Sequence, residues 1–487
     1  MNILLIDPSW RYGKLHGPSL GLSYLASVAR SLGSNVTILD FVRAGSENVS
    51  TVSEFKRHED EFFTIVEHQS ASCDLIGITC NYATFPRALK TAQKCRASNP
   101  QAMIILGGPQ ISALNYLSLA RRKEYLPVNK DVDLYVVSEG DQTFAEIIER
   151  LQSGKPIAGI LGTVMQVQGG FVRNPQRALI KDLNSINLPA WDLFNLSHYP
   201  NLLPITASRG CPYRCTFCDE RLIWKNRYRY RTPLNIVSEL MTNVQQFGVT
   251  RFRFADSTLT SYPALKEMCN LVVNKRLDIK WSCYARANEL NDKNLASLKK
   301  AGCVSVLIGV ESGTQEVLNA MNKKVLLQNI VDAVKLCKTY GIKVEASFII
   351  GFPGETEEDV YKTIDFAKRL EADSYDWHSF SPGLEMLAQL NMPEQEVEKL
   401  IRWSFEIDLD MPSRLYPEVF RNSDLTLFER HASARIPVIN TRDHQYSLLP
   451  NTLSMARIHS LVQLAIDEIA KAGLSSEESL EYRVLLY

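Results

Sequence analysis

The sequence predicts an α/β protein: a doubly wound, Rossmann-like domain, then a full or partial TIM-like β/α barrel, then a mostly helical C-terminal region. Short apolar runs alternate with helical segments through residues 1–150, and the alternation resumes over residues 201–385. Residues 151–200 are expected to form a connector. Residues 386–487 carry an apolar stripe at helical spacing.

Five apolar runs in the first domain are predicted to be strands. They lack a clean polar–apolar alternation, which is typical of parallel strands buried on both faces. Segments with helical spacing lie between them, so we expect a doubly wound sheet. The predicted strands are Asn2–Asp7, Asn35–Asp40, Leu75–Thr79, Met103–Gly107 and Leu134–Ser138. The predicted helices are Leu20–Leu32, Pro86–Ala97 and Thr143–Gln152.

In doubly wound domains, ligands bind beyond the carboxyl ends of the strands. The loops at that edge are rich in Gly, Pro, Ser and Thr, which let a backbone approach a flat ligand closely but also make ordinary turns. No G-x-G-x-x-G follows the first strand, so no dinucleotide is expected. His16 lies in one of these loops, where a lone histidine is more often a surface residue than a metal ligand. The four loops are Asp7–Gly21, Thr79–Phe85, Gly107–Ser112 and Ser138–Thr143.

The connector begins with a predicted hairpin, Gly162–Val172, whose turn is Gln168–Gly170. After it, Leu183–Pro200 is rich in Pro, Asn and Ser and only weakly periodic. We therefore expect this second segment to be a linker that crosses to the next domain.

A polar group follows each predicted strand of the second domain, as in barrels whose active site lies at the carboxyl ends of the strands. Each group has a structural alternative, since Asp256 and Arg286 could cap helices or pair with each other. Their shared position after strands favours one pocket. The strands are Leu203–Ala207, Arg251–Ala255, Lys280–Ala285, Val304–Val310 and Ala346–Ile350. The polar groups are a cysteine loop, Asp256, Arg286, Glu311, Ser312, the turn Gly351–Glu355 and the segment His378–Ser381.

The cysteine loop contains Cys211, Cys215 and Cys218 in the spacing C-x₃-C-x₂-C. Thiolates on a tight loop can ligate an iron–sulfur cluster, and most clusters take four protein ligands. Three ligands would leave one iron of a cubane open to another molecule. A structural zinc ion also needs four ligands, and no further Cys or His lies close by in the sequence to complete the set.

The composition points to a reducing, aqueous compartment. The chain has 487 residues, with Lys+Arg 54 and Asp+Glu 54, so no global field would attract nucleic acid or anionic membrane. No apolar run approaches a membrane span, and no signal peptide is expected at the N-terminus. The remaining cysteines have no disulfide-framework spacing, so we expect a cytoplasmic protein.

These motifs resemble the radical S-adenosylmethionine (SAM) superfamily, in the class with an N-terminal cobalamin-binding domain. The resemblance spans residues 1–385 and rests first on the cysteine loop, with Phe217 before its last cysteine. The other matching barrel segments are Trp281–Arg286, Gly309–Glu316, Met321–Lys324 and Phe348–Thr356. The matching segments of the first domain are Gly17–Leu25, Gly107–Pro109 and Glu139–Asp141.

The resemblance implies a cofactor set and a reaction. The three cysteines would hold a 4Fe–4S cluster whose open iron binds SAM. An external donor of the flavodoxin or ferredoxin type would supply the electron that cleaves SAM to a 5′-deoxyadenosyl radical, which takes a hydrogen atom from the substrate. In most relatives with a cobalamin domain, methylcobalamin then gives its methyl group to the substrate radical. The implied SAM-binding residues are Phe217, Asp256, Arg286, Glu311, Ser312, Gly351 and Gly354.

The first domain departs from one pattern of cobalamin proteins. The motif D-x-H-x-x-G, which supplies a histidine to cobalt, is absent, and the nearest lookalike, Asp376–Ser381, lacks the glycine and lies in the barrel. Cobalamin, if bound, is therefore expected without a protein histidine on cobalt, and the same absence leaves open that none is bound. Asn81, Tyr82 and Thr84 are the residues expected near its lower face. The full implied set is Pro18, Ser19, Asn81, Tyr82, Thr84, Gly107, Gly108, Gln110, Glu139 and Gly140.

Two other segments bear on partners. The basic aromatic run Trp224–Arg231 could suggest RNA, but it follows the cysteine loop as a family segment does, so no nucleic acid is expected. The irregular segment Leu415–Tyr446, with His431 and His444, is a candidate for specificity toward a small-molecule or natural-product substrate.

Three hypotheses follow. The first is a cobalamin-dependent radical SAM C-methyltransferase. The second is a radical SAM cyclase or rearrangement enzyme that uses cobalamin without methyl transfer or not at all. The third is an iron–sulfur or RNA-binding protein without SAM chemistry.

Overall fold

The computed structural model describes residues 1–8, 17–40, 52–81, 84–199, 201–380, 438–439, 446–447, 453 and 455–474. These residues fall into two compact units that divide at residue 200. Of the residues singled out above, His16, Tyr82, Ser381, His431 and His444 lie outside the described part, as does most of 386–487. No helix in the described ranges is long and apolar enough to cross a membrane.

The first unit is built on a seven-stranded sheet with the order β2-β1-β3-β4-β5-β6-β7. The first five strands are parallel, because a helix connects each of them to the next and crosses back over the sheet. The order 2-1-3-4-5 places a topological switch point between β1 and β3, where ligands bind in this fold. The strands are β1 (Asn2–Asp7), β2 (Asn35–Asp40), β3 (Leu75–Thr79), β4 (Met103–Gly107), β5 (Leu134–Val136), β6 (Thr163–Val167) and β7 (Gly170–Arg173).

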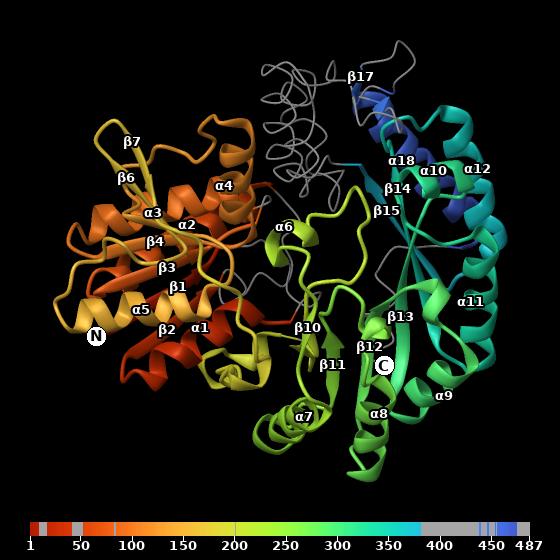
Figure 1. Ribbon diagram of the computed structural model, residues 1–487, viewed down its shortest axis with the longest axis horizontal. Helices are drawn as coiled ribbons and strands as arrows, with labels where there is room; N and C mark the ends of the chain where they lie inside the picture. Colours follow the sequence, from red (N-terminus) through yellow and green to blue (C-terminus); the bar gives the residue numbers. More distant parts are fainter. Residues whose placement is uncertain are drawn as a thin grey trace. The chain divides into compact units, whose positions relative to one another are not determined.

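Helices cover both faces of this sheet: α1 packs with α5, and α2 packs with α3 (Figure 1). The first four strands along the chain have the predicted bounds, because most of their side chains are buried. The predicted hairpin is confirmed, and it extends the sheet as its antiparallel edge. The helices are α1 (Leu20–Ser31), α2 (Val52–Ser70), α3 (Phe85–Ser98), α4 (Pro109–Arg121) and α5 (Asp141–Gln152).

Three features of the first unit differ from the sequence analysis. The predicted loop Gly107–Ser112 is wrong, because Gly108 at φ 104° turns the chain directly into α4, with Pro109 at the first helical position. The helix α2 was not predicted, since its sequence is mostly charged and polar. Leu183–Pro200 was predicted to be a linker, but its fully buried Trp191 anchors the segment to the first unit.

The second unit is an open barrel of six parallel strands with the order β15-β14-β13-β12-β11-β8. The partial barrel is therefore confirmed, and β8 and β15 are its two edges. The strands are β8 (Leu203–Ile205), β11 (Arg251–Phe254), β12 (Lys280–Ala285), β13 (Cys303–Glu311), β14 (Lys343–Ile350) and β15 (Ser374–Ser379). A short antiparallel pair, β9 (Ser208–Arg209) and β10 (Arg229–Tyr230), follows β8.

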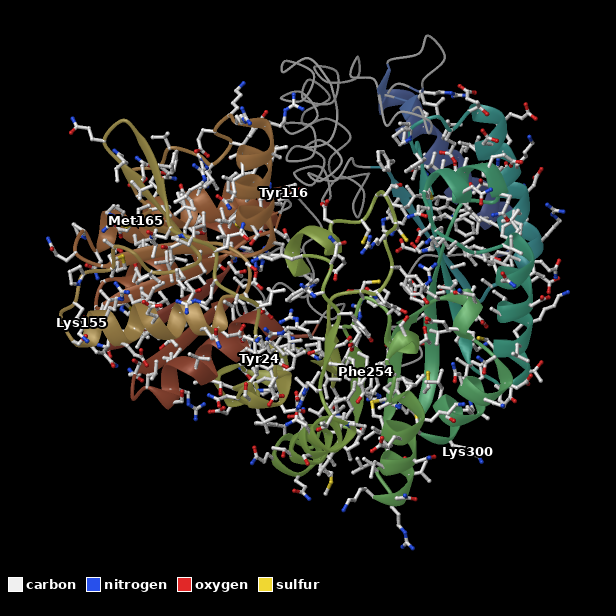
Figure 2. The ribbon with its side chains drawn as sticks, viewed as in Figure 1. Tyr24, Tyr116, Lys155, Met165, Phe254 and Lys300 are labelled. Carbon is white, nitrogen blue, oxygen red and sulfur yellow. The ribbon has the colours of Figure 1, made fainter. Side chains whose placement is uncertain are left out.

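The barrel helices lie on the outer side of this sheet (Figure 1). Phe254, labelled in Figure 2, packs edge-on against Trp281 at 5.0 Å between ring centroids, and both rings are buried. This aromatic pair joins the neighbouring strands β11 and β12 and contributes to the core of the second unit. The helices are α6 (Glu220–Trp224), α7 (Pro233–Phe247), α8 (Leu265–Asn274), α9 (Asp292–Lys300), α10 (Gln315–Ala320), α11 (Leu327–Thr339) and α12 (Glu357–Leu370).

A C-terminal helix, α18 (Met455–Lys471), packs on the same barrel. The predicted apolar stripe is confirmed as its buried face: Ile458, Leu461, Val462, Ala465 and Ile469 are at most 5% exposed. Ion pairs from Lys368 and Glu357 of α12 to this helix fix it at the barrel surface. A two-stranded antiparallel pair, β16 (Val438–Ile439) and β17 (Tyr446–Ser447), precedes it in the chain.

Candidate functional site

The cysteine loop begins at a glycine that no other residue can replace. Gly210 has φ 95°, and a Cβ on it would lie 2.1 Å from the carbonyl oxygen of Arg227. The left-handed backbone and the close approach both require glycine. This residue turns the chain out of β9, so that Cys211 starts the loop.

Asp256, which follows β11, holds the base of the loop. Its buried carboxylate accepts hydrogen bonds from the backbone N–H of Ala207, at 3.1 and 3.0 Å to its two oxygens, and from the hydroxyl of Ser208. Burial raises the pKa of this carboxyl to about 6, while the bonds from Ser208 and Ala207 act in the opposite direction. The contacts of the described residues include no ion pair between Asp256 and Arg286, so the expected alternative pairing is not formed.

A buried ion pair supports the same strand end from behind. Arg231 donates from Nη1 to the carbonyl of Thr206 at 2.8 Å, and its Nη2 lies 2.6 Å from Oε2 of Glu239. Glu239 is fully buried, and burial raises its pKa, although Arg231 acts in the opposite direction. This pair fixes the chain just before the cysteine loop.

The far side of the loop is held by the residues that follow α10. The backbone N–H of Thr216 donates to the carbonyl of Met321 at 3.0 Å, and the side-chain amide of Asn322 donates to the carbonyl of Arg214 at 2.7 Å. The loop residues between the cysteines are therefore bonded to the segment that carries the Met321–Lys324 motif.

Arg286, at the end of β12, reaches the loop itself. Its Nη1 lies 3.7 Å from Sγ of Cys215, and its Nη2 donates to the carbonyl of Lys323. The guanidinium carbon lies 3.6 Å from the centroid of the Tyr213 ring. The Nε of Arg286 is buried and has no hydrogen-bond partner among the described residues. A buried donor without a partner is costly, so this N–H is suited to an anionic ligand such as the SAM carboxylate.

Glu311 and Lys323 form a second charged feature beside the loop. Their side chains pair at 2.5 Å in a largely buried position, and Nζ of Lys323 lies 5.8 Å from the ring centroid of Phe217. The pairing of β13 with β14 shifts register between Gly309 and Glu311, and Glu311 has φ 66°. A Cβ on Gly309 would lie 2.3 Å from the Glu311 carboxylate, so the glycine makes room for this pair.

The remaining predicted SAM residues contact the surrounding helices. Ser312 is fully buried, and its Oγ lies 3.3 Å from the hydroxyls of Thr314 and Thr363. A Cβ on Gly351 would lie 2.5 Å from Ile458 of α18. Gly354 sits in the same turn with φ 91°. At these positions the structure shows packing, and their contacts with SAM stay predictions.

The three cysteines are free thiols in the structure. Burial raises the pKa of Cys211, and it raises the pKa of Cys218 to about 12. In the described part of the chain, no three His, Cys, Asp or Glu side chains are grouped tightly enough for a single metal ion. A cubane differs from a zinc site because each thiolate binds a different iron. Three thiols on one short loop beside a guanidinium therefore fit a cluster better than a mononuclear ion.

In the first unit, the predicted cobalamin residues lie at the carboxyl ends of β3, β4 and β5. Asn81 and Thr84 exchange hydrogen bonds of 3.0 Å between backbone N–H and side chain, which shapes the loop after β3. Gln110 Nε2 and Ser138 Oγ are buried without a partner among the described residues, and Ser138 has φ 67°. Buried polar atoms without partners at this edge fit a large polar ligand.

The other predicted residues of this set have roles within the unit. A Cβ on Gly108 would lie 2.4 Å from the carbonyl oxygen of Cys80, so this glycine lets two loops touch. Glu139 accepts a hydrogen bond from the backbone N–H of Ile180 at 2.8 Å. Gly140 caps α5, and Ser19 precedes α1. Pro18 and Gly107 lie at the same carboxyl edge, and Tyr82 is outside the described residues.

A pocket of about 390 Å³ lies elsewhere in the first unit, between β2 and residues 192–199. Asp40 and Tyr199, two of its lining residues, are hydrogen-bonded to each other. None of the predicted cobalamin residues lines it. The pocket therefore gives no support to the predicted ligand edge.

Sequence reasoning missed several residues of the site. Lys323 could have been found, because it lies in the Met321–Lys324 motif beside the predicted Glu311. The pair Arg231–Glu239 gave no signal, since neither residue follows one of the strands that the sequence predicts. Tyr213 and Glu289, which bond to each other, are 76 positions apart and share no motif.

Comparison with known proteins agrees with this arrangement. The sequence model of the Radical SAM superfamily matches residues 205–367. An uncharacterized methyltransferase of Pyrococcus horikoshii is 32% identical over 77% of this chain and 79% of its own length. The anaerobic magnesium-protoporphyrin IX monomethyl ester cyclase of Rubrivivax gelatinosus is 26% identical over 78% of this chain and 68% of its own.

Among solved structures, the radical SAM methyltransferase TsrM from Kitasatospora setae has a similar fold. With tryptophan and a SAM analogue bound, it gives a TM-score of 0.64 at 20% identity, covering 81% of this chain and 76% of its own. TsrM has also been solved with cobalamin and a 4Fe–4S cluster bound. The chain belongs to the radical SAM superfamily.

Proposed function

We propose that this protein is a cobalamin-dependent radical SAM C-methyltransferase. The observation that carries the proposal is the three-cysteine loop at the carboxyl edge of an open barrel, with the Arg286 guanidinium against Cys215. The doubly wound unit with the strand order 2-1-3-4-5 supports the cobalamin part. The relatives named as methyltransferases, one of them solved with cobalamin, support methyl transfer.

The residues of the barrel have the following roles in this proposal. Cys211, Cys215 and Cys218 hold the cluster, and the buried Nε of Arg286 binds the SAM carboxylate. Phe217, whose ring centroid lies 5.8 Å from Nζ of Lys323, would contact the adenine of SAM. When bound, the cluster and SAM supply the 5′-deoxyadenosyl radical, and cobalamin supplies the methyl group. The protein contributes by orienting these groups and by keeping water from the radical.

The last strand of the barrel offers a polar contact for the substrate. Asp376 and His378 are two residues apart on β15, so their side chains share one face, and Nε2 of His378 lies 2.7 Å from the Asp376 carboxylate. In the register of β14 they are opposite Ser347 and Ile349. A histidine oriented by a carboxylate is a hydrogen-bonding partner for a substrate N–H or O–H group.

The proposal is tested with methyl-labelled SAM. The protein, reconstituted anaerobically with iron, sulfide and cobalamin, is incubated with dithionite and labelled SAM. Tryptophan and magnesium-protoporphyrin IX monomethyl ester serve as probe substrates, because similar proteins act on or bind them. Label in a product together with 5′-deoxyadenosine supports a methyltransferase. Cys215→Ala is the matched control and should release no 5′-deoxyadenosine.

A second candidate is a radical SAM cyclase, favoured by the 26% identity to an anaerobic cyclase over most of its length. For this function, 5′-deoxyadenosine would form and the porphyrin probe would be consumed without incorporation of label. Release of no 5′-deoxyadenosine by the fully reconstituted protein with any probe would contradict both candidates.

A further inference from the structure

Arg286 makes a contact that SAM binding does not require. Its Nη1 donates a hydrogen bond to Sγ of Cys215 at 3.7 Å, a longer distance than to oxygen because sulfur is a larger acceptor. Its Nη2 is used by the carbonyl of Lys323, and its Nε remains for another ligand. One guanidinium can therefore donate to a cluster thiolate and to SAM at the same time, through different nitrogens.

The position of this guanidinium is fixed by a residue of the cysteine loop. The Tyr213 ring lies flat beneath it, 3.6 Å from ring centroid to guanidinium carbon, and the Tyr213 hydroxyl donates to Oε1 of Glu289. Glu289 ends the 3₁₀ turn η6 (Ala287–Glu289), which begins directly after Arg286. Tyr213 thus links the loop to the same turn that carries the arginine.

Glu289 is itself held rigidly. Its carboxylate also accepts hydrogen bonds from Thr260 at 2.7 Å and from Ser261 at 2.8 Å, both in the 3₁₀ turn η5 (Leu259–Ser261). The backbone N–H of Arg286 donates to the Thr260 hydroxyl at 3.1 Å. Three hydroxyls therefore converge on one carboxylate, and the network returns to Arg286.

Hydrogen bonds to cluster sulfurs are among the factors that set the reduction potential of iron–sulfur clusters. We propose that Arg286 donates a hydrogen bond to the cluster-bound thiolate of Cys215 and raises the cluster's reduction potential, and that Tyr213 and Glu289 position it for that bond. The physical reason is that the reduced cluster carries one more negative charge than the oxidised cluster, so a fixed cationic donor stabilises the reduced form more. The inference rests on the proposed cluster site.

The experiment is a redox titration of the reconstituted full-length protein without SAM, followed by the EPR signal of the reduced cluster. Arg286→Lys keeps the charge but loses the fixed planar donor. Tyr213→Phe keeps the ring beneath the guanidinium and removes the hydroxyl that Glu289 holds. Tyr284→Phe is the matched control, because its hydroxyl also contacts an arginine, but that arginine is Arg253 and not the one that contacts Cys215.

We expect Arg286→Lys to disfavour reduction at least tenfold, which is about 59 mV for one electron. Tyr213→Phe should disfavour reduction of the cluster about threefold in the equilibrium constant. The reduction potential of the Tyr284→Phe control should equal that of the wild type. Because Tyr213 acts through the arginine, the double variant should match Arg286→Lys alone rather than the sum of the two shifts. Additive shifts would mean that Tyr213 does not act through Arg286.

Iron content and thermal unfolding of the cluster-free protein separate this role from a merely structural one. The inference would be overturned if Arg286→Lys kept its full iron content and its equilibrium constant for cluster reduction stayed within twofold of the wild-type value. The proposed function would then remain intact. Loss of iron in parallel in both variants would also overturn it, since the residues would then build the loop rather than tune the cluster. A wild-type protein that assembles no cluster would defeat the proposed function and this inference together.

Discussion

Glu355 lies in the turn that follows β14, and its ionisation should destabilise the folded protein as the pH rises. Replacing Glu355 with glutamine should remove this pH dependence. Glu355 is 3% exposed, and its Oε2 accepts a hydrogen bond from the backbone N–H of Gly351 at 2.5 Å. Burial raises the pKa of this carboxyl from 4.5 to about 8, against the opposing effect of the backbone bonds from Gly351 and Phe352. Glutamine keeps an acceptor for the Gly351 N–H and cannot ionise.

The magnitude follows from the pKa change. A rise from 4.5 to about 8 corresponds to about 5 kcal/mol of unfolding free energy, at about 1.4 kcal/mol for each pKa unit. The folded state keeps a proton that the unfolded state has already lost, so stability falls as the pH rises between these two values. The stability that the folded protein gains by keeping Glu355 protonated is fully present below about pH 4.5 and is lost above about pH 8.

The assay is urea denaturation of wild type and Glu355→Gln between pH 5 and 9. The difference between the two proteins should grow in favour of the variant as the pH rises, by about 4 kcal/mol over this range. Glu358→Gln is the matched control on the next helix, where the side chain is 78% exposed, and its difference from wild type should stay nearly constant. A constant difference for Glu355→Gln as well would refute the argument that Glu355 is buried in its neutral form.

Three further changes have defined outcomes. Gly210→Ala should lower iron incorporation severalfold, because its Cβ meets backbone at 2.1 Å; iron counts after reconstitution measure this. Arg231→Met should destabilise the protein by about 3–5 kcal/mol in urea titrations, because it leaves the Glu239 carboxylate buried without its cation, and Glu239→Gln in the same background should recover part of the loss. Gly313→Ala should lower the free energy of unfolding by about 1–3 kcal/mol, since its Cβ would lie 2.6 Å from Cα of Thr363, and an unchanged midpoint would contradict this packing.

The sheets could be predicted from the sequence because their strands are continuous buried runs. Asn2–Asp7 and Leu75–Thr79 have the bounds that the apolar pattern indicates. The helix α4 could not be predicted, because Gly-Gly-Pro is equally suited to a turn and to a helix start, and tertiary contact with Cys80 decides between them. Helix α2 was missed because most of its residues are charged or polar, although it buries Phe62, Phe63 and Val66.

In the candidate site, the residues that follow strands could be predicted from the sequence, but the contacts between loops could not. The cysteines and Arg286 could be predicted because each follows a strand and the carboxyl ends of parallel strands meet at one edge. Asp256 was found by the same rule, but its hydrogen bonds to Ala207 and Ser208 could not be read from the sequence. The network of Tyr213 and Glu289 depends on two loops that meet only after the barrel forms, and no local spacing encodes such a meeting.

The helix α18 has a consequence for the segment that precedes it. The chain leaves the barrel at the end of β15 and is back on it at Ile458, which packs on Gly351. The two described elements that flank residues 381–454 therefore lie on the same unit. Loop-closure entropy grows only logarithmically with length, so doubling the length of a flexible segment between two such fixed points costs about 0.6 kcal/mol. The length of chain between β15 and α18 is thus only weakly constrained by the packing of α18 on the barrel.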